Sequence, residues 1–214
     1  RLMVPPIVRE EITLEGFQRR VSAHMAARGF REVMTPSLIN GERTAKLDPD
    51  VAQRLVRLKN PLSAELDVMR PSMLFGLLQA AAHNIARQQK DLRLFELGRV
   101  YGIVDGRTVE HERLAFLMTG ASGLDTWRKG TAAADVMDAA EEVELLMARS
   151  GMRGYAPTPT DHPLLANGAR SDAGRVTLAT WGVVRPEVAK ALDVAQPVLY
   201  AELDIVAVKN ALAS

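Results

Sequence analysis

The chain has 214 residues, of which 47% are hydrophobic and 25% are charged, and its formal net charge is +1. These values are typical of a globular protein and give no sign of a nucleic-acid or membrane partner recognised by bulk charge. The lack of cysteine excludes a disulfide framework and a cysteine-ligated metal, and no apolar run approaches the roughly 20 residues that a membrane span needs.

The N-terminus and the cysteine content bear on origin and compartment. The chain begins at Arg1 rather than at methionine, and its first residues lack the apolar run of a signal peptide. A chain without cysteine fits a reducing compartment. We therefore expect a fragment of a longer, cytoplasmic protein.

The first 36 residues predict a lead-in, a helix and a short strand. Residues 1–8 contain two adjacent prolines, so we expect an extended lead-in from an upstream domain. Residues 30–36 predict a short strand ended by Pro36. Between about residues 10 and 28, apolar side chains recur at helical spacing before Gly29, which predicts an amphipathic helix that ends there: Leu14, Phe17, Val21 and Met25.

The next segment is polar. Residues 41–54 carry few apolar side chains, and Asp48-Pro49-Asp50 predicts a turn and the start of a helix. Residues 55–59 alternate apolar and basic side chains, which predicts a strand.

Two prolines punctuate the middle of the chain. A proline biases the residue before it away from helical backbone, so Asn60 before Pro61 and Arg70 before Pro71 are predicted to be extended or in turns. We expect Pro71 at or near the first position of a helix with Ser72 as its cap. The apolar spacing from residue 74 to residue 88 predicts the body of this helix.

From Leu92 onward the apolar period changes to two, which predicts a strand with two unlike faces. We expect one face to carry Phe95, Leu97, Arg99 and Tyr101, and the other Leu94, Glu96, Gly98 and Val100. The dipeptide Asp105-Gly106 then predicts a tight hairpin to a second, antiparallel strand at residues 113–119.

The rest of the chain continues the mixture of helices and strands. We predict a loop at residues 120–131 that contains Trp127, and a helix at residues 135–149 whose Glu141 and Glu142 lie on a solvated face. Further predictions, in chain order, are a strand at 152–159, a loop from His162 through Gly174, a strand at 175–184, a helix at 186–192, a strand at 198–206 and a helix at 208–213.

The sequence contains no self-sufficient catalytic motif. The four histidines, His24, His83, His111 and His162, are scattered and lack the spacing of a metal site. We expect His24 and His83 to be solvated or packed, and His162 to structure its loop. No serine has the context of a nucleophile elbow, and no glycine-rich segment carries the lysine of a phosphate-binding loop.

Several segments, in order and at matching spacing, resemble the beta subunit of bacterial phenylalanyl-tRNA synthetase. The similarity covers nearly the whole chain and indicates the synthetase-like core of that subunit. The segments that carry it are Asn60-Pro61-Leu62-Ser63, Met69-Arg70-Pro71-Ser72-Met73-Leu74, Asn84-Ile85-Ala86-Arg87-Gln88, Leu94-Phe95-Glu96-Leu97-Gly98-Arg99-Val100-Tyr101 and His162-Pro163.

The resemblance implies an α+β fold of the class II aminoacyl-tRNA synthetase type, with an antiparallel sheet flanked by helices, in one domain spanning residues 1–214. The N-terminal helix, strand and proline resemble motif 1 of class II synthetases, which builds a subunit interface in that family. We therefore expect an interface, with an apolar helix face left exposed when the partner is absent, at Phe17, Val21, Met25 and Pro36.

The motifs that bind ATP in class II synthetases are degenerate or missing. Arg93, Glu96 and Arg99 resemble the motif 2 strand, in which an arginine and an acidic residue hold ATP and the amino acid. Residues 200–209 lack the glycines and the arginine with which motif 3 grips the triphosphate. We therefore expect no catalytic, cofactor-binding or metal-binding residue in this chain.

The resemblance thus implies a non-catalytic core that assembles with the catalytic alpha subunit into an (αβ)2 complex. The alpha subunit would use ATP and magnesium to charge tRNA with phenylalanine, and the full complex would bind the tRNA; the isolated fragment could associate with itself. Two alternatives stay open. One is a stand-alone class II-like ligase or ATP-dependent amidating enzyme with Arg93, Glu96 and Arg99 as its site, and the other is a regulatory module that binds a free amino acid or another protein.

Overall fold

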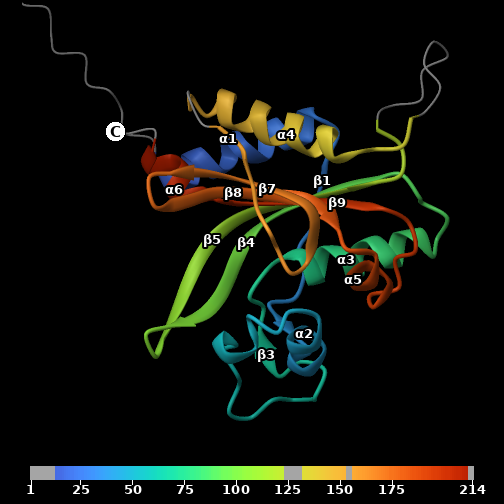
Figure 1. The fold of residues 1–214 in the computed structure, drawn as a ribbon, viewed down its shortest axis with the longest axis vertical. Coiled ribbons are helices and arrows are strands. Elements are labelled where there is room, and N and C mark those ends of the chain that lie inside the picture. The colour runs from blue at the N-terminus through green and yellow to red at the C-terminus, as the bar shows by residue number, and fades with distance from the viewer. Residues whose placement is uncertain (1–12, 123–131, 153–155, 212–214) are drawn as a thin grey trace, which may run out of the picture.

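The computed structural model describes residues 13–122, 132–152 and 156–211. A seven-stranded sheet, in the order β1-β4-β5-β9-β8-β7-β6, runs through the middle of the molecule. Helices α1, α4 and α6 cover one face, while α3 and α5 cover the other (Figure 1). The α+β class and the antiparallel sheet flanked by helices are confirmed, with one exception in the sheet, because β1 pairs with β4 in parallel.

Helix α1 (Leu14–Ala27) forms where the apolar spacing predicted it. The Thr13 side chain accepts a hydrogen bond from Gly16 N and caps the start. Gly29 follows the end with φ +83°, a backbone conformation that glycine adopts without strain. The predicted lead-in at residues 1–8 lies outside the described residues.

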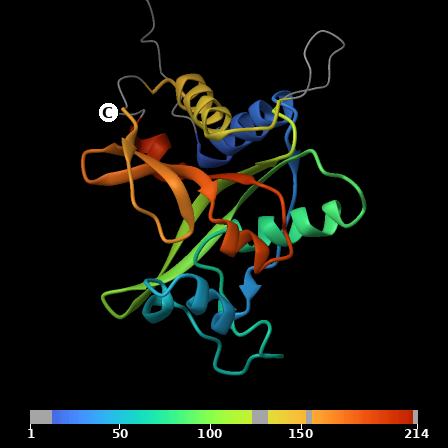
Figure 2. The ribbon, with the colours of Figure 1, turned by 45° about the vertical axis from the view of Figure 1, so that its right-hand side comes forward.

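A small lobe follows the short edge strand β1 (Arg31–Glu32). It contains α2 (Gly41–Leu47), the 3-10 helix η1 (Ala52–Arg54) and a two-stranded sheet made of β2 (Leu38–Ile39) and β3 (Val68–Met69). Figures 1 and 2 show this lobe on the α3 side of the large sheet.

The small lobe contains a helix that the sequence did not predict. Residues 41–47 of the polar segment form helix α2, because the Asn40 side chain caps it through Arg43 N and Gly41 N donates to Asp67. Asp48-Pro49-Asp50 leads through a turn into the 3-10 helix η1, as predicted. The strand predicted at residues 55–59 is reduced to an isolated bridge between Arg57 and Val68.

The central hairpin forms as predicted. Strands β4 (Leu92–Val104) and β5 (Arg107–Thr119) pair without interruption and are joined by Asp105 and Gly106, whose φ values are +49° and +73°. Positive φ at both positions matches the twist of the strands that the turn joins.

Helix α3 (Leu74–Ile85) begins at Leu74, where the predicted apolar spacing starts, and ends three residues before residue 88. Pro71 precedes the helix by three residues, so it lies near the start, as predicted, but not at the first helical position. Ser72 nevertheless helps to start the helix, because its hydroxyl accepts a hydrogen bond from Leu74 N at 3.1 Å.

The second half of the chain adds four strands and three helices to the described fold. Helix α4 (Val136–Arg149) has the capping box of Asp135 and Asp138, whereas the predicted loop with Trp127 lies largely outside the described residues. The remaining elements are β6 (Thr158–Pro159), β7 (Leu165–Ala173), β8 (Val176–Val184), α5 (Pro186–Lys190), β9 (Val198–Asp204) and α6 (Ile205–Ala211).

The prediction of a loop from His162 through Gly174 is wrong, because most of this segment forms strand β7. This strand pairs with β8 through two irregularities in register, which obscure the alternating pattern in the sequence. A side-chain carbon at Gly168 would lie 2.8 Å from Thr160 O, so the strand needs glycine there. In the described part of the chain, no helix is long and apolar enough to span a membrane.

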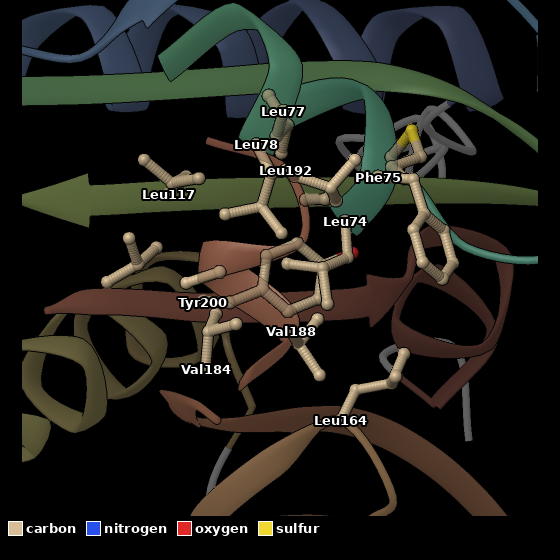
Figure 3. Close-up of a cluster of buried hydrophobic side chains, with 14 of the residues drawn as sticks. Leu74, Phe75, Leu77, Leu78, Leu117, Leu164, Val184, Val188, Leu192 and Tyr200 are labelled. Carbon is tan, nitrogen blue, oxygen red and sulfur yellow. The ribbon is translucent and has the colours of Figure 1, made fainter. Parts of the chain in front are cut away.

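The two faces of the sheet carry separate cores. Phe95 joins the core under α1, α4 and α6, while Leu94 and Val100 join the core under α3 and α5, as the two-residue period of β4 predicted. Figure 3 shows the second core, in which Leu74, Leu77 and Leu78 from α3 meet Val188 and Leu192 near α5 over Tyr200 of β9.

Candidate functional site

A cleft of about 360 Å³ opens on the α3 side of the large sheet. Its floor comes from β5, β8 and β9, and its walls come from the β4–β5 hairpin, the start of α3, the segment around η1 and the loop before β7. The polar side chains that line it are Asp48, Arg54, Ser72, Tyr101, His111, Arg113, His162, Thr177, Thr180, Tyr200, Glu202 and Asp204.

Glu202 is the hub of the polar contacts in this cleft. Its Oε2 accepts hydrogen bonds from Ser72 Oγ at 2.9 Å, from Met73 N at 3.2 Å and from the Tyr200 hydroxyl. Burial and the neighbouring carboxylate raise the pKa of Tyr200 well above 10, so the phenol stays protonated and donates. Glu202 thereby ties β9 to the start of α3.

Arg113 lies on β5, beside β9. It forms ion pairs with Asp204 and, at 3.7 Å, with Glu202. Two carboxylates therefore neutralise this arginine, and its guanidinium is not available to clamp an anion.

His162 closes one side of the cleft. Its Nδ1 accepts a hydrogen bond from Leu164 N at 3.2 Å, and its carbonyl accepts from Arg185 Nε at 3.3 Å. Burial lowers the pKa of His162, although Asp48 across the cleft acts in the opposite direction. These contacts organise the loop before β7, which is the role that we expected for this histidine.

A second polar cluster is buried between β4 and α3. Arg70 is 3% exposed and donates from Nη1 to Glu96 Oε1 at 2.8 Å and from Nε to Arg99 O at 2.8 Å. Thr35 Oγ1 donates to Glu96 Oε2 at 2.7 Å. Both charges are paired and hydrogen-bonded within the chain, as burial requires.

A glycine makes room for this ion pair. A side-chain carbon at Gly98 would lie 2.4 Å from Arg70 Nη2 and 3.2 Å from Glu96 Oε1. Arg70, Glu96 and Gly98, which all lie in the segments that carry the family resemblance, therefore act together as one buried structural unit.

The predicted trio of Arg93, Glu96 and Arg99 does not form one site. Glu96 faces α3 and is bound to Arg70, whereas Arg93 lies on the other face and bonds to Glu142 at 3.2 Å. Arg99 is exposed and pairs with Glu110 and Glu112 on the neighbouring strand. Odd and even positions of a strand point to opposite faces, which separates Glu96 from the two arginines, and Arg93 and Arg99 lie six positions apart along β4.

The prediction that Glu142 lies on a solvated helix face is wrong. Glu142 is 2% exposed, and its carboxylate accepts hydrogen bonds from Arg28 Nη2 at 2.9 Å and from Arg28 Nε at 3.0 Å. The guanidinium of Arg93 also lies 5.2 Å from the centre of the Phe30 ring. The partners of Glu142 are Arg28, which follows the end of α1, and Arg93 of β4, and both are far away in sequence. Spacing within the helix could not reveal this contact; only the neighbouring Glu141 is exposed as predicted.

The predicted interface residues differ in their exposure to solvent. Phe17, Val21 and Met25 are 3%, 4% and 0% exposed, because α1 packs this face on its own sheet. The expectation of an exposed apolar face on this helix is therefore wrong. Pro36 is exposed, and the nearby Met34 is 95% exposed.

The remaining family-motif residues serve the fold in different ways. Phe95 is a core residue, Pro71 lines the cleft beside Ser72, and Asn60, Pro61 and Pro163 lie at the surface. No group of three histidine or acidic side chains within the described ranges could hold a metal ion.

Residues 2–205 match the family model described as the phenylalanyl-tRNA synthetase beta chain CLM domain. Phenylalanine–tRNA ligase beta subunits from Methylococcus capsulatus and Neisseria meningitidis are 33% and 35% identical over 191 and 193 residues. These alignments cover 86% of this chain but 23% of each relative, so the chain spans about a quarter of their length.

Among solved structures, the pyrrolysyl-tRNA synthetase of Desulfitobacterium hafniense is similar to this chain in fold. The superposition has a TM-score of 0.72 at 15% identity and covers 94% of this chain and 70% of that structure. At this identity, the likeness supports the class II synthetase fold alone.

Proposed function

Because the chain belongs to the phenylalanyl-tRNA synthetase beta chain CLM domain family, we propose that it is a catalytically silent scaffold. It assembles with the catalytic alpha subunit in an (αβ)2 complex that ligates phenylalanine to tRNA. In this proposal ATP and magnesium are used by the alpha subunit, tRNA is bound by the whole complex, and the complex works in the cytoplasm.

The negative charge of the cleft supports the proposal that this core is not catalytic. Residues 198–214 contain neither glycine nor arginine, and the side chains that β9 presents to the cleft include the carboxylates Glu202 and Asp204. A bound triphosphate would meet these negative charges, while Arg113 is already occupied by them. The floor of the cleft therefore presents carboxylates and a paired arginine where a triphosphate would need a free cation.

The motif-1-like segment supports the assembly role in a revised form. The apolar face of α1 is used inside the chain, so the partner would contact the residues that follow β1. Met34 and Pro36 are exposed there, and Thr35 between them is anchored to Glu96. An exposed apolar side chain on an anchored segment suits a subunit contact.

The test measures assembly and activity together. Full-length beta chain is mixed with alpha subunit and followed by size-exclusion chromatography with light scattering. We expect a heterotetramer that Met34→Asp weakens, whereas Met137→Asp, a control at a 69% exposed methionine on α4, leaves it intact. The beta chain alone should show no ATP–pyrophosphate exchange. Exchange by the beta chain alone, or failure of the unmodified chains to associate, would overturn the proposal.

A further inference from the structure

The cleft on the α3 side of the sheet has an apolar wall that the assembly role does not use. Four separate segments build this wall, which includes Val51, Leu74, Val100 and Leu164. Leu74 and Leu164 belong to the core that Figure 3 shows. The volume of about 360 Å³ lies in the range of roughly 300–1,000 Å³ that is typical of sites for small molecules. Such sites combine apolar walls with a few polar groups that orient the ligand.

The charged side chains of the cleft leave one negative charge in excess. Among the described residues that line it, the carboxylates are Asp48, Glu202 and Asp204, and the guanidiniums are Arg54 and Arg113. Arg113 pairs with Glu202 and Asp204. Arg54 is exposed, and its Nε donates to a backbone oxygen. The cleft therefore favours a positively charged ligand.

Asp48 is the carboxylate of the cleft that lacks a counter-ion. It is half-buried before η1, and its Oδ1 accepts a hydrogen bond from Val51 N at 3.3 Å. In the part of the chain that the structure describes, no ion pair forms to Asp48. Burial raises the pKa of Asp48, because ionising a carboxylate that is partly withdrawn from water is costly. A cation bound beside it would lower this cost.

His162 gives the cleft a hydrogen-bond donor. Because its Nδ1 accepts from Leu164 N, the proton of the neutral ring lies on Nε2. Burial lowers the pKa of His162, so the ring is mostly neutral at pH 7. The charges of Asp48 and Glu202 both raise this pKa, so both carboxylates lie near the ring. A hydroxyl group can accept from Nε2–H and donate to Glu202 Oε1, which lies 3.7 Å from Arg113 Nε, beyond hydrogen-bond distance.

We propose that the cleft binds a small amino alcohol, which is a primary amine with an apolar body and a hydroxyl group. The ammonium group lies at Asp48, the hydroxyl group between His162 and Glu202, and the apolar body against Leu74 and Val100. A metal ion is a poor occupant, because no group of three histidine or acidic side chains in the described ranges could hold one. A phosphate ester would add to the excess of negative charge.

The test is isothermal titration calorimetry of the full-length beta chain with three compounds that share one apolar body. Leucinol carries the ammonium and hydroxyl groups, leucine has a carboxylate in place of the hydroxymethyl group, and 4-methylpentan-1-ol lacks the amine. We expect leucinol to bind one-to-one and the other two to bind at least about tenfold more weakly. Leucine adds a negative charge to the cleft, and the alcohol leaves Asp48 without a partner.

Two nearby aspartates provide a matched pair of variants. Asp48→Asn removes the charge but keeps the acceptor for Val51 N, and it should raise the dissociation constant of leucinol at least about tenfold. Asp50→Asn, at an exposed position that does not line the cleft, should leave it unchanged. Gly102→Ile tests the cleft without changing a charge. A side-chain carbon at Gly102, which lines the cleft, would have Arg54 O as its nearest neighbour at 3.9 Å, so isoleucine fits the fold and should weaken binding by filling the cleft.

The outcomes either support or overturn the proposal. It is wrong if leucinol does not bind, if Asp48→Asn weakens binding no more than Asp50→Asn does, or if Gly102→Ile binds leucinol like the parent chain. Tighter binding of leucine than of leucinol would make the cleft a site for free amino acids and would overturn the proposal as well. The assembly role is tested separately, because it fails only if unmodified alpha and beta chains do not associate.

Discussion

Replacing Glu96 by glutamine tests whether the family motif around β4 is structural. Glutamine keeps nearly the same shape and one acceptor oxygen, but it removes the negative charge beside Arg70. The guanidinium would keep its bonds to Arg99 O at 2.8 Å and to Thr35 Oγ1 at 2.9 Å. It would remain buried without a counter-charge.

The expected cost follows from the burial of the pair. The two side chains are 4% and 3% exposed, so solvent cannot compensate the guanidinium. Breaking a buried ion pair from one side costs about 3–5 kcal/mol. Because glutamine can still accept one hydrogen bond, we expect a loss of about 3 kcal/mol in the free energy of unfolding, a large part of the roughly 5–15 kcal/mol of a typical domain.

The assay is urea denaturation at neutral pH, followed by the fluorescence of the buried Trp181. Glu144→Gln, at an exposed position of α4, is the matched control and should stay within about 0.5 kcal/mol of the parent chain. The double change of Arg70→Met with Glu96→Leu removes both charges and should cost less than Glu96→Gln alone. A loss below about 1 kcal/mol for Glu96→Gln would refute the reasoning.

Two further predictions concern other buried groups. Glu142→Gln should lower the free energy of unfolding by about 1–3 kcal/mol in the same assay, because it removes the charge shared by Arg28 and Arg93; a change within the error of the control would contradict this. His162→Asn should flatten the pH dependence of stability: burial lowers the folded pKa of His162 below its unfolded value, so the parent chain loses stability as the pH falls below about 6.5 and the variant should lose less. Denaturation midpoints measured from pH 7.5 down to pH 5 check this, and equal slopes for both chains would contradict it.

The fold could be predicted where a local rule dominates. Asp105-Gly106 predicted the hairpin because two positive φ values suit those residues. The apolar spacing predicted α1 and α4. The lack of a triphosphate clamp, which we expect from residues 200–209, stays a prediction.

The features that the sequence did not predict depend on contacts between segments that are distant in sequence. Helix α2 has no clear apolar stripe and is held by Asn40 and Asp67, which lie outside it. Glu142 is buried because arginines from two other elements reach it. The cleft gathers Ser72 from the start of α3 and Glu202 from β9, and no short sequence pattern connects these positions.

The position of β9 also sets an order for folding. It is the last strand in the sequence, yet it lies in the middle of the sheet, between β5 and β8. The hairpins β4–β5 and β7–β8 each pair nearby residues and can form early, but they cannot join until residues 198–204 enter between them. During synthesis, both hairpins therefore keep an open edge until residues 198–204 have been made, and an open edge can pair with other chains. A chain cut before Val198 should keep the two hairpins but lose the single sheet into which β9 joins them.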